Sequence, residues 1–164
     1  MLLGFETSAF QGTVALFELA HHPEMQDRLF AEVSPIVTNH RTGNSTEPEY
    51  IEALMSHAPY LEAVVKECLR KYPNVVRLER RVSAPEGTTL AGIHLDPGTL
   101  VEVPTFALHH NPEFYPEPEV FRPERFLPEN KHLLVPYTFL PFGDGPRNCT
   151  KNLTRFFLIG NRVI

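Results

Sequence analysis

Proline divides this chain into two parts with different folding possibilities. Of its sixteen prolines, nine lie between Pro104 and Pro146. A proline has no backbone N–H and disfavours a helical residue before it, so no regular helix or central strand can run through this stretch. Eight aromatic side chains accompany these prolines. We therefore expect an ordered meander that packs on a core, in place of a structureless loop.

The first half of the chain has helical periodicity. The apolar pattern of a first helix already includes residue 3, and no Ser, Thr, Asp or Asn cap precedes it. We therefore expect the chain to begin inside this helix. Three more helices follow Pro23, with a polar loop at 38–48, and the fourth spans about Tyr60 to Tyr72. The apolar positions of the four helices are Leu3, Phe10, Val14 and Phe17; Met25, Leu29, Val33 and Ile36; Ile51, Leu54 and Met55; and Leu61, Val65, Cys68, Leu69 and Tyr72.

After Pro73 the period of the pattern changes. Segments 75–83, 88–95 and 99–103 are typical of short strands, with turns at Gly92 and Pro97-Gly98. The fold class expected is therefore mainly α with small β-sheets (α+β). A length of 164 residues suits one domain or part of a larger one.

Composition excludes several classes of protein. The formal net charge of −5 disfavours nucleic-acid and anionic-membrane binding, which require clustered Lys and Arg. We expect no transmembrane helix, because no run of eighteen apolar residues is present, and no signal peptide at the N-terminus. Two cysteines cannot build a disulfide framework.

The segment from Phe142 to Cys149 carries the sharpest chemical signal. Gly143, Gly145 and a proline shape a tight loop whose inward backbone amides can hydrogen-bond a sulfur, and Arg147 favours a thiolate. Those are the needs of a metal-binding sulfur. A surface turn with an incidental cysteine explains the same residues, and both interpretations stay open. A zinc site is disfavoured because no second cysteine lies nearby.

Three further motifs are weak when taken singly. Glu67-x-x-Arg70 lies off its helix's apolar stripe, so periodicity alone favours a solvated ion pair. Pro123-Glu124-Arg125-Phe126 is a charged turn between aromatics. Gly4-Phe5-Glu6-Thr7 joins poor helix formers to an acid, which indicates either a helix distorted to host a ligand or proton relay, or a weak helix terminus.

Two histidine pairs and one cysteine are given structural interpretations. We interpret His21-His22 and His109-His110 as surface or helix-end residues and not as metal ligands. Cys68 lies on an apolar stripe and is expected to be a small buried hydrophobe.

Taken in this order, the four motifs resemble the C-terminal part of the cytochrome P-450 family of haem-thiolate monooxygenases. The resemblance covers residues 2–149, and the sequence is most similar to the microsomal drug- and steroid-oxidising branch, including thromboxane synthase-like members. The matching elements are Gly4 to Thr7 for the distal-helix motif, Glu67 and Arg70 for Glu-x-x-Arg, Pro123 to Phe126 for Pro-Glu-Arg-Phe, and Phe142, Gly145, Arg147 and Cys149 for the cysteine loop.

The resemblance implies haem b as the cofactor, with Cys149 as the axial ligand of its iron. Phe142 would shield the sulfur, and Gly143 and Gly145 would let the loop approach it. Arg147, with Arg80 as a second candidate, would pair with the haem propionates.

The resemblance also assigns the remaining motifs. Glu67, Arg70 and Arg125 would form a buried charge triad that locks the meander to the fourth helix, which reverses the surface interpretation. Thr7, helped by Glu6, would deliver protons on the oxygen-binding side of the haem.

The implied activity inserts one oxygen atom of O₂ into a lipophilic organic substrate. Electrons would come from NADPH through a reductase. A full-length member would lie on the cytoplasmic face of the endoplasmic reticulum membrane, held by an N-terminal anchor that this chain lacks.

The match stops after the cysteine. The family pattern Cys-x-Gly-x-x-x-Ala-x-x-Glu meets Lys151, Arg155 and Leu158 here. We expect a single partial domain over 1–164 with a divergent tail at 150–164. The alternative hypothesis is a truncated, catalytically inactive fragment, or the product of an incorrect gene model, without stable haem binding.

Overall fold

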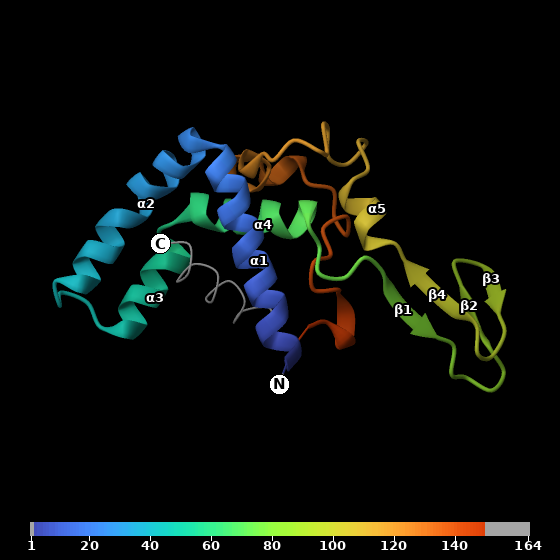
Figure 1. Ribbon diagram of the computed structural model, residues 1–164. Helices are drawn as coiled ribbons and strands as arrows, with labels where there is room; N and C mark the ends of the chain where they lie inside the picture. The colour runs from blue at the N-terminus through green and yellow to red at the C-terminus, as the bar shows by residue number, and fades with distance from the viewer. Residues whose placement is uncertain (1, 150–164) are drawn as a thin grey trace.

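The N-terminal half of the chain is helical. The computed structural model describes residues 2–149, with side chains from Glu6 onward (Figure 1). Proline lies in the first turn of the second, third and fourth helices, where a missing N–H is tolerated. The helices are α1 (Leu2–His21), α2 (Pro23–Arg41), α3 (Glu47–Ser56) and α4 (Pro59–Lys71).

The connection between α2 and α3 is shorter than the predicted loop at 38–48. The α2 helix continues to Arg41, and the Thr42 hydroxyl donates to the carbonyl of Thr38 at its end. Gly43, at φ +77°, turns the chain. Thr46 and Glu49 then form a capping box that starts α3, so local side-chain contacts compress the loop to five residues, 42–46.

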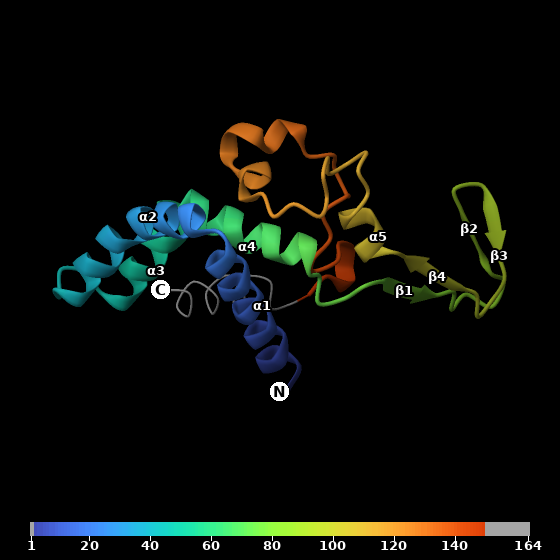
Figure 2. The same cartoon turned by 45° about the horizontal axis from the view of Figure 1, so that its top comes forward.

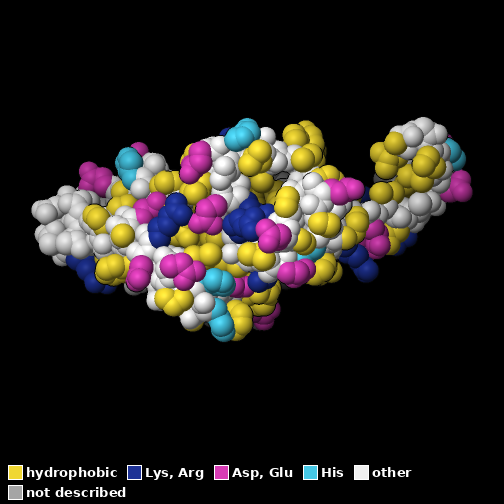
Figure 3. Space-filling model, turned by 90° about the horizontal axis from the view of Figure 1, so that it is seen from above, with side chains coloured by type: hydrophobic (Ala, Val, Ile, Leu, Met, Phe, Trp, Pro, Cys, Tyr) yellow, Lys and Arg dark blue, Asp and Glu magenta, His cyan; other side chains and the backbone are white. Residues whose placement is uncertain are grey.

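Two small antiparallel sheets follow α4. Strand β1 (Leu78–Arg81) pairs with β4 (Leu100–Val103), and β2 (Thr88–Leu90) pairs with β3 (Ile93–Leu95). The predicted turn at Gly92 divides segment 88–95 into the two strands of a hairpin. This hairpin projects from the body of the molecule, and Figure 3 shows apolar side chains gathered on it at the right.

The proline-rich stretch is an ordered meander, as predicted. It contains a short helix and 3₁₀ turns, and it buries three of its aromatic side chains: Tyr115, Phe121 and Phe126. These elements are α5 (Thr105–His109), η1 (Pro123–Phe126), η2 (Pro128–Leu133) and η3 (Gly145–Arg147). With four helices and two small sheets beside it, the fold is α+β, as the sequence indicated.

Helix α4 is the centre of the core. Figure 2 shows α1 on one side of it and the meander on the other. Because both sides are covered, α4 buries polar as well as apolar positions. Its buried residues are Tyr60, Leu61, Ala63, Val64, Val65, Glu67, Cys68, Leu69 and Arg70.

The apolar stripe predicted on α1 is largely wrong. Phe10 and Phe17 are 47% and 55% exposed, and only Val14 is buried among the stripe positions whose side chains are described. Polar contacts decide which face of α1 is buried. The Gln11 amide donates to the carbonyl of Tyr72 at 2.7 Å, which turns the side of α1 that carries Gln11 toward α4.

A second polar contact joins the C-terminal ends of α1 and α4. The buried Glu18 carboxylate accepts hydrogen bonds from Lys71 Nζ at 2.8 Å and from the Tyr72 hydroxyl. Burial alone would raise the pKa of Glu18, but the hydrogen bonds from Lys71 and Tyr72 outweigh burial and hold this pKa below its usual value of 4.5.

We expect Glu18→Gln to reduce the acid sensitivity of the fold. A carboxyl whose pKa is lowered on folding contributes stability above its unfolded pKa and loses it as pH falls through the folded value. The variant should therefore be less stable than the native protein at pH 7, and the difference should shrink below pH 4.5. Urea unfolding from pH 7 to pH 3 measures this. Glu62→Gln, which removes an exposed pair with Lys66, is the control and should show no such convergence.

Candidate haem-binding site

The loop that ends at Cys149 is closed by its own backbone. The Cys149 amide donates to the carbonyl of Phe142 at 2.9 Å. Gly143 and Gly145 turn the chain with φ angles of +73° and +77°, a region that disfavours other residues. The Asp144 carboxylate accepts from the Gly145 amide at 2.7 Å. The loop is thus shaped by backbone contacts, which leave the cysteine side chain uncommitted to the loop's own hydrogen bonds.

The two cysteines have opposite environments. Cys68 is fully buried in α4, and burial raises the pKa of its thiol far above the usual value, so it is a packed neutral side chain as expected. Cys149 is partly exposed. Of the two, only Cys149 offers a sulfur that a metal centre can reach.

Two arginines near this loop are available to anions. Among the described residues, no carboxylate lies within ion-pair distance of Arg80 or Arg147, and both side chains are exposed. A Cβ on Gly143 would lie 3.7 Å from both Leu78 methyl groups, so the loop packs against β1. Arg80 is two residues beyond Leu78 and lies on the same face of that strand.

These observations fit haem b. The group requires one soft donor and cationic partners for its two propionates. The loop supplies an accessible thiol and the Arg147 guanidinium, and β1 supplies that of Arg80; neither arginine pairs with a carboxylate among the described residues. A Cβ at Gly145 would meet no atom of the described residues within 4 Å, so the loop is open at this position. A zinc site would need further cysteine or histidine ligands.

Glu67 and Arg70 form a buried bidentate ion pair on α4. Arg70 Nε donates to Glu67 Oε2 and Arg70 Nη2 to Glu67 Oε1, each at 2.8 Å, and both side chains are fully buried. The interpretation from periodicity alone, a solvated pair, is therefore wrong. Arg125 Nε lies 3.5 Å from Glu67 Oε1, and Arg125 Nη2 donates to the carbonyl of Glu117. The structure thus brings Glu67, Arg70 and Arg125 together.

Backbone groups of the meander complete this charge cluster. Arg70 donates to the carbonyl of His109 at 2.9 Å and to that of Pro118 at 2.7 Å. The Arg122 amide donates to Glu67 Oε1 at 2.9 Å. These backbone partners lie 39 to 55 residues away in the sequence, so the periodicity of α4 cannot predict them.

His109 is a buried residue whose surroundings sequence reasoning missed. We expected a surface or helix-end position; it does end α5, but it is completely buried. Its Nε2 accepts a hydrogen bond from the Leu140 amide at 2.9 Å. Burial lowers the pKa of His109 to about 4, so the ring is neutral at pH 7. The other three histidines of the two pairs are exposed or half-buried at helix ends: His21, His22 and His110.

The remaining predicted residues lie on α1. Glu6 is exposed and Thr7 is half-buried, and α1 runs through them without interruption, so the distorted helix proposed as one interpretation is not present. Figures 1 and 2 place the N-terminal half of α1 and the Cys149 loop on the same side of α4. Lys151, Arg155 and Leu158 lie outside the described residues.

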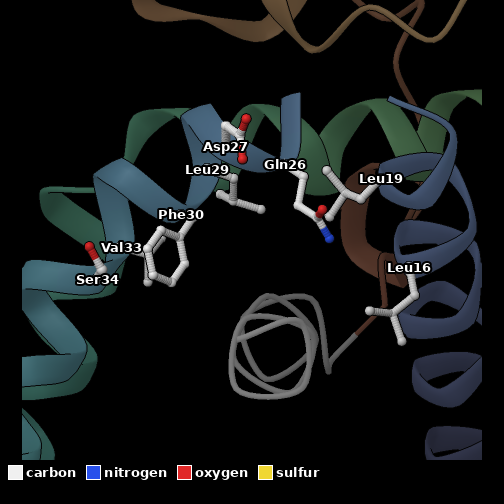
Figure 4. Close-up of a pocket in the computed structure, with 8 residues that line it drawn as sticks. All are labelled: Leu16, Leu19, Gln26, Asp27, Leu29, Phe30, Val33 and Ser34. Carbon is white, nitrogen blue, oxygen red and sulfur yellow. The ribbon is translucent and has the colours of Figure 1, made fainter. Parts of the chain in front are cut away.

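A separate cavity of about 360 Å³ lies between α1 and α2 (Figure 4). In the close-up, Gln26 and Phe30 point from α2 into the space that Leu16 faces from α1. None of the residues that line it belongs to the four motifs, and we assign it no role in the chemistry. Among the described residues, no helix combines the length and apolar character that crossing a membrane requires.

Comparison with known proteins identifies the family. The family model described as Cytochrome P450 matches residues 1–150. Cytochrome P450 3A19 of Capra hircus aegagrus is 44% identical over 146 residues, which are 89% of this chain and 63% of that protein. Lithocholate 6-beta-hydroxylase of Mesocricetus auratus is 41% identical over 146 residues, 89% of this chain and 27% of that protein.

A relative from a third organism gives a similar result. Probable cytochrome P450 6a13 of Drosophila melanogaster is 40% identical over 148 residues, 90% of this chain and 29% of that protein. The chain thus spans less than two thirds of the goat protein and less than a third of the other two. The similarity to 3A-named relatives agrees with the predicted microsomal branch. With the family model covering 1–150 and all four motifs present, the chain belongs to the cytochrome P450 family.

Proposed function

We propose that the protein carrying these residues is a haem-dependent monooxygenase that inserts one oxygen atom of O₂ into a lipophilic organic substrate. The observation that carries the proposal is the single accessible thiol, Cys149, in a glycine-turned loop beside two arginines that have no carboxylate partner in the part of the chain that the structure describes. Haem bound through a thiolate supplies the electron donation that favours O–O cleavage. A relative whose name specifies hydroxylation supports the reaction type.

The residues of the loop have separate tasks in this proposal. Cys149 binds the iron, and its amide, held by Phe142, orients the sulfur. The Phe142 ring, which is half-buried, limits the access of water to that sulfur. Arg147 and Arg80 bind the propionates, because planar guanidiniums match carboxylates well.

In this proposal, two residues of α1, Glu6 and Thr7, transfer protons. The exposed Glu6 carboxylate exchanges protons with solvent, and the Thr7 hydroxyl, one residue further into the helix, holds a proton on the distal side. Electrons are supplied from NADPH by a reductase. We place the full-length protein at the cytoplasmic face of the endoplasmic reticulum membrane, on the basis of its 3A-named relatives.

We further propose that these 164 residues alone do not catalyse oxygenation. Phe10, Leu16 and Phe17 of α1 are each about half exposed, so this apolar face is open to water. A haem site that is open to water cannot protect reactive oxygen species. An exposed apolar face also favours association between copies of the chain.

The test compares two proteins. One is the 164-residue chain, and the other is the reading frame extended with the sequence that flanks it in the genome. Each receives haem, a reductase, NADPH, O₂ and a panel of lipophilic substrates. We expect oxygenated product that depends on NADPH and O₂ from the extended protein only.

Either half of the proposal can fail separately. An extended protein that binds haem without a thiolate-type Soret band in its reduced carbonyl complex contradicts the monooxygenase assignment. Turnover by the 164 residues contradicts the inactivity of the shorter chain and shows that it is a self-sufficient catalytic unit.

A further inference from the structure

One buried histidine connects the charge cluster on α4 to the start of the Cys149 loop. The carbonyl of His109 accepts from Arg70 Nη1 at 2.9 Å, and the imidazole Nε2 accepts from the Leu140 amide at 2.9 Å. Leu140 stands at the entry to the loop, where its own carbonyl accepts from the Gly143 amide at 3.2 Å. A continuous series of hydrogen bonds therefore runs from Arg70 to the first turn of the loop.

The hydrogen bond to Leu140 fixes which nitrogen of the His109 ring carries the proton. An Nε2 that accepts a hydrogen bond from an amide leaves the proton on Nδ1. That Nδ1 is buried and makes no hydrogen bond of good geometry among the described residues, although the backbone carbonyls of Arg70 and Leu69 lie close enough to the ring to favour its protonated form. The hydrogen bond that Nε2 accepts from Leu140 is therefore the one bond of good geometry that the ring makes among the described residues.

The surrounding rings hold the imidazole in one orientation. The ring centroid of His109 lies 5.4 Å from that of Phe139 at an interplanar angle of 30°, and 6.5 Å from that of Tyr115 edge-on. Arg70 lies over the Tyr115 ring, with its Cζ 5.4 Å from the ring centroid. These ring contacts restrict the orientation in which Nε2 reaches Leu140, and burial keeps the ring neutral and able to accept.

We propose that His109 is a positioning residue whose Nε2 sets the place of Leu140, and through it the Cys149 loop, relative to the Glu67–Arg70 pair. It touches no reacting atom. Its carbonyl contact with Arg70 is made by the backbone, so side-chain substitutions leave that contact in place and probe the Nε2 hydrogen bond alone.

Three substitutions separate the acceptor from the packing. His109→Gln carries an amide oxygen at about the reach of Nε2, His109→Asn carries it only at about the reach of Nδ1, and His109→Phe fills the space with no acceptor. Amide hydrogen exchange of the 164-residue chain reports on the Leu140 N–H directly. The amides of Leu29 to Val33 in α2 serve as the internal reference, since they make no contact in this series.

We expect His109→Asn and His109→Phe to accelerate exchange at Leu140 about tenfold, as loss of one buried hydrogen bond does, with α2 unchanged. His109→Gln should keep the native rate. The ¹⁵N shifts of the native ring should show the proton on Nδ1.

Each other result overturns the proposal. Native exchange at Leu140 in His109→Asn shows that Nε2 does not hold that amide. Acceleration in His109→Gln equal to that in His109→Asn, or loss of protection throughout α2 in either variant, shows that the ring matters only for packing. A proton found on Nε2 has the same consequence.

A second readout rests on the proposed function. In the haem-loaded protein, His109→Asn should lower the fraction that gives a thiolate-type Soret band, and His109→Gln should restore it. A native protein that binds no haem would contradict the proposed function but leave the exchange result to decide on His109, so the two failures are distinguishable.

Discussion

In the extended protein, substituting serine for Cys149 will abolish the thiolate-type Soret band of the reduced carbonyl complex while leaving the fold intact. The loop is closed by the backbone contact between the Cys149 amide and the Phe142 carbonyl, and serine preserves that contact. A hydroxyl has nearly the same size as a thiol, but it does not ionise near neutral pH and gives no comparable electron donation to iron. The loss should therefore be complete, with circular dichroism and urea unfolding unchanged.

The second cysteine provides the matched control. Cys68→Ala removes a thiol from the core of α4, far from any accessible surface, and should keep the thiolate-type band. Retention of the band in Cys149→Ser would remove Cys149 from the role of axial ligand. Loss of the band in both variants would mean that the spectrum reports on the fold and not on the ligand.

Replacing Arg70 with lysine should destabilise the chain by about 3–5 kcal/mol, the usual effect of breaking a buried ion pair. One ammonium cannot reproduce two parallel hydrogen bonds to Glu67 together with the contacts to the carbonyls of His109 and Pro118. Because whole domains are stable by only about 5–15 kcal/mol, this loss is a large share of the total, and the yield of folded, haem-loaded protein should fall. Urea unfolding and haem incorporation measure the two effects.

An exposed pair in the same molecule calibrates this result. Arg28 donates to Glu124 at 2.9 Å, joining α2 to η1, but the two side chains are 50% and 37% exposed. Arg28→Lys is the same chemical change and should alter the free energy of unfolding by about 1 kcal/mol or less. If Arg70→Lys has no larger effect than Arg28→Lys, the planar guanidinium is not what the buried site requires.

Hydrophobic periodicity predicted where the helices lie, but it did not predict that a second face of α4 is also buried. The stripe of α4 was correctly assigned because Leu61, Val65 and Leu69 repeat at helical spacing. The same rule put Glu67 and Arg70 in solvent, since a stripe predicts one buried face and α4 has two. The second face is covered by the meander, which arrives some fifty residues later in the chain. Only the family motif indicated the buried triad.

Burial on α1 failed for a related reason. Phe10 and Phe17 have the apolar character that predicts burial, yet the contacts of Gln11 and Glu18 with the end of α4 turn the helix the other way. His109 had no signal at all, because a five-residue helix is too short for a period and its partner Leu140 is 31 residues distant. The loop at Cys149 was predictable because its glycines and proline act locally.

The charge cluster on α4 also constrains how the chain can be made. Glu67 and Arg70 leave the ribosome early, but the carbonyls that complete Arg70 belong to residues 109 and 118, and the amide that completes Glu67 belongs to residue 122. Until residue 109 has been synthesised, the two charges have only each other and water, and Glu67 gains its backbone donor only when residue 122 has followed. The centre of the core therefore cannot close during translation before three quarters of these 164 residues exist, and α4 must stay hydrated until the meander reaches it.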